Sequence, residues 1–237
     1  MLRPLFLQSV LLISSVVWAQ EAGSGSAVVP TAADESKSSA EAALPEVSFT
    51  LDFPDSQPEH YSIQVPSEGL AHYQSTGRIS RESADTDTFD LEFPISADVR
   101  ERIFRLTKDA GFFRRDLDSH RKDLAFMGKK TLRYRSGSDS VESAFNYSSN
   151  AAAHELSDLF QNLSTTLEFG HRLDYDHHYQ KLALDEELKH MQEMAQEKEL
   201  VAIAAIQPIL EQIVADHSVM NVARARAQQL LQAADGK

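Results

Sequence analysis

One amphipathic segment, from Ser96 to Phe113, constrains the fold most strongly, because alternating strand patterns lie on both sides of it. Ser96 is a suitable N-cap, since its hydroxyl can accept a hydrogen bond from a free backbone N–H, and Gly111 is a suitable end. A helix with one apolar face needs a partner that covers the face, so the neighbouring strands predict a sheet. The apolar residues that recur at helical spacing are Val99, Ile103, Leu106 and Ala110.

Strands are predicted wherever apolar and polar residues alternate with a period of two. The ranges with this pattern are 47–53, 61–65, 70–75, 89–93, 131–135 and 141–147. A second amphipathic helix begins near Asn150 and carries Leu156, Leu159, Phe160, Leu163 and Leu167 on one side. Strands, helix, strands, helix is an order that predicts an α+β domain over residues 46–170, with a mainly antiparallel sheet and two helices on one face.

Residues 171–234 show helical patterns alone and are predicted to form an all-helical C-terminal segment. Pro208 lies inside an apolar stretch, where the loss of a backbone donor should kink or divide the helix. No heptad pattern lasts for three repeats, which favours a helical hairpin or small bundle over a long coiled coil. The apolar positions that begin this segment are Leu184, Leu188, Met191 and Met194.

The N-terminus has the pattern of a secretory signal over residues 1–19. Arg3 precedes a mainly apolar run, and Ala19 ends a small-residue cleavage site. Residues 20–45 are rich in Ala, Ser, Glu and Pro and predict a disordered linker. The chain has no cysteine, which excludes disulfides, thiolate metal sites and a lipoprotein anchor. A signal without disulfides favours a bacterial periplasmic or secreted protein.

The net charge argues against nucleic acid as a partner, and one basic stretch suggests an anionic ligand. Removal of Arg3 with the signal takes the formal net charge from −13 to −14, so nucleic acid is not an expected partner. Between Arg105 and Arg135, however, ten basic residues face four acidic ones. We interpret part of this stretch as a candidate anion-binding site, with pairing to the protein's own carboxylates as the alternative. The candidate residues are Arg114, Arg115, Arg121 and Lys122.

A run from His171 to His178 concentrates imidazoles and carboxylates, which are suitable ligands for zinc or nickel. The alternative is a polar linker between domains, because adjacent His177 and His178 point in different directions on any regular element. The candidate metal ligands are His171, Asp174, His177 and His178. No nucleophile elbow or phosphate-binding glycine loop is present, so we expect no catalytic residue and no cofactor.

The signal, the linker, the 61–69 hairpin, the segment from Phe93 to Ser96 and the segment from Lys181 to Leu188 together resemble uncharacterised exported proteins of Acidobacteria-like bacteria. The resemblance covers residues 47–232 and implies only an exported bacterial protein, and no catalytic or binding residue carries over from it. We therefore expect a non-enzymatic binding or interaction module, whose partner is another envelope protein or an anionic ligand. The alternatives are an enzyme of unrecognised type and a metal-binding protein that uses residues 171–178.

Overall fold

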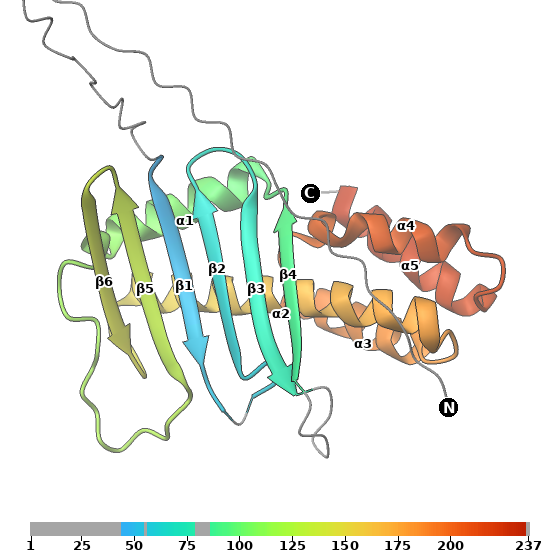
Figure 1. The fold of residues 1–237 in the computed structure, drawn as a ribbon, viewed down its shortest axis with the longest axis horizontal. Helices are drawn as coiled ribbons and strands as arrows, with labels where there is room; N and C mark the ends of the chain where they lie inside the picture. Colours follow the sequence, from blue (N-terminus) through green and yellow to red (C-terminus); the bar gives the residue numbers. More distant parts are fainter. Residues whose placement is uncertain (1–43, 55, 79–85, 236–237) are drawn as a thin grey trace, which may run out of the picture. The chain divides into compact units, whose positions relative to one another are not determined.

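The computed structural model describes residues 44–54, 56–78 and 86–235, so the predicted signal peptide and nearly all of the predicted linker lie outside the described residues. Six strands form one antiparallel sheet in the order β4-β3-β2-β1-β5-β6 (Figure 1). The strands are β1 (Glu46–Asp52), β2 (His60–Pro66), β3 (Ala71–Arg78), β4 (Thr86–Phe93), β5 (Lys129–Ser136) and β6 (Asp139–Phe145). The predicted α+β class with an antiparallel sheet is confirmed.

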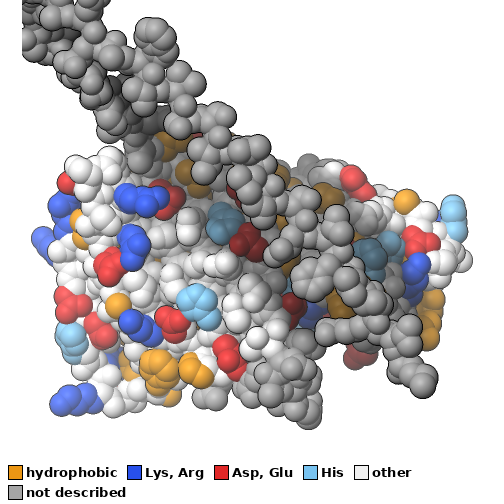
Figure 2. Space-filling model, viewed as in Figure 1, with side chains coloured by type: hydrophobic (Ala, Val, Ile, Leu, Met, Phe, Trp, Pro, Cys, Tyr) orange, Lys and Arg blue, Asp and Glu red, His pale blue; other side chains and the backbone are white. Residues whose placement is uncertain are grey.

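The two faces of the sheet differ as the alternation predicts. In β1, Val47, Phe49 and Leu51 are buried, while the residues between them are partly exposed. Phe49 lies opposite Ile63 of β2, and both side chains are fully buried on the face that the helices cover. Figure 2 shows the other face, where charged side chains of both signs are scattered over the visible part.

Helix α1 (Ala97–Asp109) buries the predicted face, including Ile103, Leu106 and the following Ala110. Ser96 is its N-cap, but the Ser96 hydroxyl makes no capping bond to a backbone N–H. It hydrogen-bonds the Asp98 carboxylate instead and thereby lowers the pKa of Asp98. Gly111 follows the helix with a φ of +70°, a left-handed conformation that suits glycine and ends the helix where the sequence predicts.

Helix α2 (Ala151–Tyr179) crosses the strands on the same face of the sheet as α1 (Figure 1). Phe160 stacks on Phe49 of β1, Ser164 contacts Tyr73 of β3, and His171 contacts β4. A helix of 29 residues is about 43 Å long, whereas six strands span roughly 24 Å. The C-terminal part of α2 therefore extends past the β4 edge and needs a cover of its own.

That cover consists of α3 (Leu184–Gln196), α4 (Gln207–Ala215) and α5 (Asn221–Asp235), beside the C-terminal half of α2 (Figure 1). Pro208 lies in the first turn of α4, and the short 3₁₀ helices 111–113 and 203–206 lie after α1 and before α4. The predicted division of the helix at Pro208 is thus confirmed. The interpretation of residues 171–178 as a linker is wrong, because α2 continues through them and keeps Leu173 buried.

Candidate functional site

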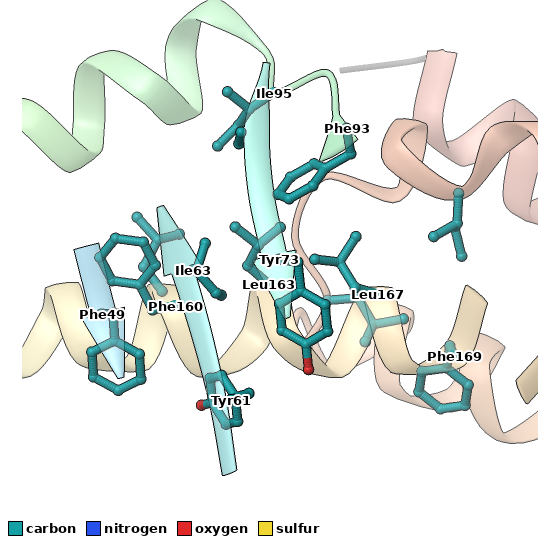
Figure 3. Close-up of a cluster of buried hydrophobic side chains, with 14 of the residues drawn as sticks. Phe49, Tyr61, Ile63, Tyr73, Phe93, Ile95, Phe160, Leu163, Leu167 and Phe169 are labelled. Carbon is teal, nitrogen blue, oxygen red and sulfur yellow. The ribbon is translucent and has the colours of Figure 1, made fainter. Parts of the chain in front are cut away.

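A cavity of about 410 Å³ lies between the start of β2, the segment before it, and helices α2 and α3. Its size falls within the range of roughly 300–1,000 Å³ that is typical of small-molecule sites. The wall from α2 is one helical stripe, which includes Gln161, Ser164, Glu168 and Arg172. Leu51, Pro58, Tyr61, Phe169 and Met194 supply apolar surface, and His190 lies at the α3 side. Figure 3 shows Tyr61 and Tyr73 of the sheet among the buried side chains that lie between the sheet and α2.

A hydrogen-bond network joins the sheet to α2 at the cavity. The Tyr73 hydroxyl donates to Glu168 Oε1 at 2.7 Å, and the Ser75 hydroxyl donates to the same oxygen at 2.7 Å. Because the single Tyr73 proton is directed at Glu168, Ser164 acts as the donor in its 2.9 Å contact with the Tyr73 hydroxyl. Tyr73 and Ser75 share one face of β3, while Ser164 and Glu168 lie one turn apart on α2.

These polar groups lie inside an otherwise apolar core. Tyr73 is fully buried, and Ser75 and Ser164 are at most 4% exposed. A buried polar group costs free energy unless it is hydrogen-bonded, and an apolar residue of the same size is often as stable or more stable. The network satisfies Tyr73, Ser75 and Ser164, so the fold tolerates it. Such a network beside a cavity is the kind of feature that marks a functional site.

The two buried tyrosines are held in their neutral, proton-donating form. Burial raises the pKa of Tyr73 far above its usual value, and the nearby Glu168 carboxylate raises it further. Burial likewise raises the pKa of Tyr61, and repulsion from Glu168 adds to this shift. Neither phenol can therefore act as a base near neutral pH.

Glu168 is the charged member of the network, and one of its carboxylate oxygens can still accept hydrogen bonds. Both hydroxyl donors bind Oε1, and no described residue donates a hydrogen bond to Oε2. Arg172, one turn further along α2, is bound elsewhere: its Nε donates to Glu187 Oε1 at 2.6 Å, and its guanidinium carbon lies 4.6 Å from the Phe169 ring centre. The cavity thus contains a carboxylate oxygen that lacks a protein donor within the described ranges.

Sequence analysis missed this site. Tyr73, Ser75, Ser164 and Glu168 were assigned only to a strand or a helix. One signal was available, because Ser75 takes an inward-facing position in the alternation of β3, where an apolar residue is expected. The position of Ser75 in the strand pattern does not identify its hydrogen-bond partner, because Glu168 is 93 residues away in the chain.

The four predicted metal ligands do not converge. His171 bonds Asp87 at 2.7 Å, His177 bonds Asp216 at 3.0 Å, and His178 bonds the Asp174 carbonyl at 2.8 Å. On a helix, residues 171 and 178 are about 10 Å apart along the axis, whereas both imidazoles of one zinc site lie within roughly 2.1 Å of the metal. Nowhere in the described ranges do three or more His, Asp or Glu side chains form a group that could hold a metal ion.

Two of the four predicted anion ligands already face carboxylates. Arg121 binds both oxygens of Asp123, at 3.2 and 2.6 Å, and Arg114 lies 3.7 Å from Asp139. Arg115 and Lys122 are exposed and make no ion pair with another described residue. Figure 2 shows basic and acidic side chains interspersed on the visible surface. Local pairing, the alternative to an anion site, therefore accounts for half of the candidates.

Lys130, in the same basic stretch, is not a surface charge at all. It is 8% exposed, and its Nζ donates to the carbonyls of Met127 and Asn146 at 3.2 and 3.1 Å. Burial lowers the pKa of Lys130, while the Asp158 carboxylate opposes this shift. A smaller cavity of about 140 Å³ adjoins it. Lys130 therefore contributes to packing at the β5 end of the sheet.

Across the described residues, no helix combines the length and the apolar character that a membrane span requires. No model of a known protein family matches this chain. No curated protein is similar enough in sequence to be recognised as a relative. The function must therefore be inferred from the groups that the fold brings together.

Proposed function

We propose that this chain is an exported bacterial binding module that holds a small polar ligand in the cavity between the sheet, α2 and α3. The observation that carries this proposal is the placement of Glu168: two buried hydroxyls fix one carboxylate oxygen, and the other is left for a ligand. Fixed polar groups placed among apolar side chains are how ligand pockets orient a ligand.

Binding is favoured over nucleophilic catalysis by the partners of the two serines. A serine nucleophile needs an adjacent base, most often a histidine, that takes its proton. Ser75 donates to Glu168 and Ser164 donates to Tyr73, and neither contacts a histidine among the described residues. The cavity therefore offers fixed hydrogen-bonding groups without an activated serine.

Export to the periplasm or the exterior is part of the proposal and is supported by the N-terminal pattern. Arg3, the apolar run and Ala19 form a signal with a cleavage site. The absence of cysteine is compatible with a bacterial envelope protein that needs no oxidative folding. N-terminal sequencing of the exported protein should give Gln20 as its first residue.

The binding function can be tested with the mature protein and the substitution Glu168→Gln. The amide oxygen of glutamine can still accept from Tyr73 and Ser75, whereas its NH₂ replaces the free carboxylate oxygen with a donor. Thermal unfolding is measured with panels of amines, amino acids, sugars and carboxylates. A ligand present at 100 times its Kd raises the free energy of unfolding of the wild type by about 2.7 kcal/mol, which raises Tm by roughly 5–10 °C.

Glu155→Gln is the matched control, because Glu155 is exposed on the same helix and pairs with Arg102 outside the cavity. We expect the stabilisation in the wild type and in this control, and its loss in Glu168→Gln. If no class raises Tm, or if Glu168→Gln responds as the wild type does, the proposal is wrong.

A further inference from the structure

Two charged residues of α2, Glu168 and Arg172, line the cavity, and they do not pair with each other. Arg172 lies four residues after Glu168 on α2, a spacing at which a glutamate and an arginine normally pair. They do not pair here, because Glu168 is turned to Tyr73 and Ser75 of the sheet, and Arg172 is turned to Glu187 of α3. Glu168 is thus left without a counter-ion among the described residues, although an arginine is only one turn away.

From this imbalance we propose that the ligand carries a protonated amine, whose ammonium group binds Glu168 Oε2. The inference rests on the binding function proposed above and names its ligand class. An isolated carboxylate in a partly desolvated site is costly unless an opposite charge joins it. An ammonium group provides that charge and also hydrogen-bond donors, the complement of an oxygen that only accepts.

The surroundings of Glu168 favour an organic cation over a metal ion. A divalent metal needs several carboxylate or imidazole ligands, and no group of three or more such side chains is placed to hold one within the described ranges. Tyr61, Phe169 and Met194 supply apolar surface, which suits the carbon skeleton of an amine. Aromatic rings also attract cations, as the Arg172 guanidinium over Phe169 demonstrates.

An anionic ligand is disfavoured by the same residues. It would approach Glu168 without an unpaired lysine or arginine from the described lining to offset the repulsion, because Arg172 is already paired with Glu187. The formal net charge of −13 acts in the same direction at longer range, since it attracts cations to the protein and repels anions.

Three probes that share a phenethyl skeleton and differ in charge separate the alternatives: phenethylamine, its neutral N-acetyl derivative and the anion phenylpropionate. Kd is measured for each by NMR titration of the mature wild-type protein, and the shifted amides locate the bound probe. We expect phenethylamine to bind about tenfold more tightly than either analogue, as the loss of a charged hydrogen bond implies. Added salt should weaken the binding of phenethylamine, because it screens the attraction between the ammonium group and Glu168.

In Glu168→Gln we expect phenethylamine to lose about tenfold in affinity, while Glu155→Gln leaves its Kd unchanged. Equal or tighter binding of the acetylated or anionic probe at the same residues would overturn the amine assignment and leave the binding function standing. Failure of all three probes, with no response to the wider panels, would overturn both. The probe comparison uses only the wild type, so it decides the question even if Glu168→Gln does not fold.

Discussion

At the scale of single residues, two positions on α2 show how the sheet and the C-terminal helices are joined. Glu168 receives hydroxyl donors from β3, and Thr166, which is fully buried, accepts from the backbone N–H of Val201 at 3.1 Å. Gly170 follows Glu168 by two residues on α2, and Ile206 packs directly against it. A Cβ at position 170 would lie 2.5 Å from Ile206 Cγ2 and 3.1 Å from Ile206 Cβ.

Gly170→Ala is therefore expected to destabilise the protein by about 1–3 kcal/mol, the usual cost of overpacking a filled core. The direction of the change in stability is informative, since a Gly→Ala substitution in a solvent-exposed helix would stabilise the protein by about 1 kcal/mol. Urea unfolding of Gly170→Ala, Ile206→Ala and the double variant measures the effect. Because Ile206→Ala removes the clashing Cγ2, the double variant should lose less than the two single changes added together. A stabilised Gly170→Ala variant would contradict this packing.

At the scale of elements, residues 171–178 show why a local pattern misled. Their polar side chains fit a linker, yet they belong to a helix because Leu173 extends the buried stripe of α2 past Gly170. Two of their histidines, His171 and His177, then bind residues of neighbouring elements. His177 binds Asp216 at 3.0 Å, and Lys181 binds the same carboxylate at 2.6 Å, which joins the α2–α3 turn to the α4–α5 turn.

The contacts of Asp216 with His177 and Lys181 predict that the stability of the protein depends on pH. Hydrogen bonds from Lys181, and then from Ser218, hold the pKa of Asp216 well below its usual range, with a smaller contribution from His177. A carboxyl whose pKa is depressed by folding stabilises the protein above its ordinary pKa of about 4 and loses that effect as pH falls through the depressed value. Asp216→Asn should therefore unfold at lower temperature than the wild type at pH 7, with a gap that narrows on acidification.

The control for this change is Asp174→Asn, because Asp174 is exposed on α2 and its carboxylate lies 3.6 Å from His178, which is on the same helix. Its melting temperature should follow that of the wild type across the same pH range. A gap between Asp216→Asn and the wild type that stayed constant down to pH 2 would show that Asp216 acts through packing and not through its charge.

At the scale of the whole fold, what could be predicted from the sequence was local. Alternation located the six strands, and helical spacing placed Ile103 and Leu163 in the core. The strand order and the meeting of Ser75 with Glu168 depend on long-range pairing, which no periodicity encodes. The predicted boundary between residues 46–170 and 171–234 was likewise drawn from a local pattern. Composition changes there, but α2 continues from the sheet to α3–α5 without a break.

A continuous α2 implies that the sheet and the C-terminal helices unfold together. One contiguous buried cluster runs from Val47 of β1 to Leu230 of α5, and α2 contributes to it on both sides of Gly170. We expect a single transition in which circular dichroism and hydrogen exchange of β1 and α5 amides give the same free energy of unfolding. A chain that ends at Gly170 should not fold, because it removes the helices that bury Phe169. If that chain unfolds cooperatively with native sheet resonances, residues 46–170 are a domain in their own right.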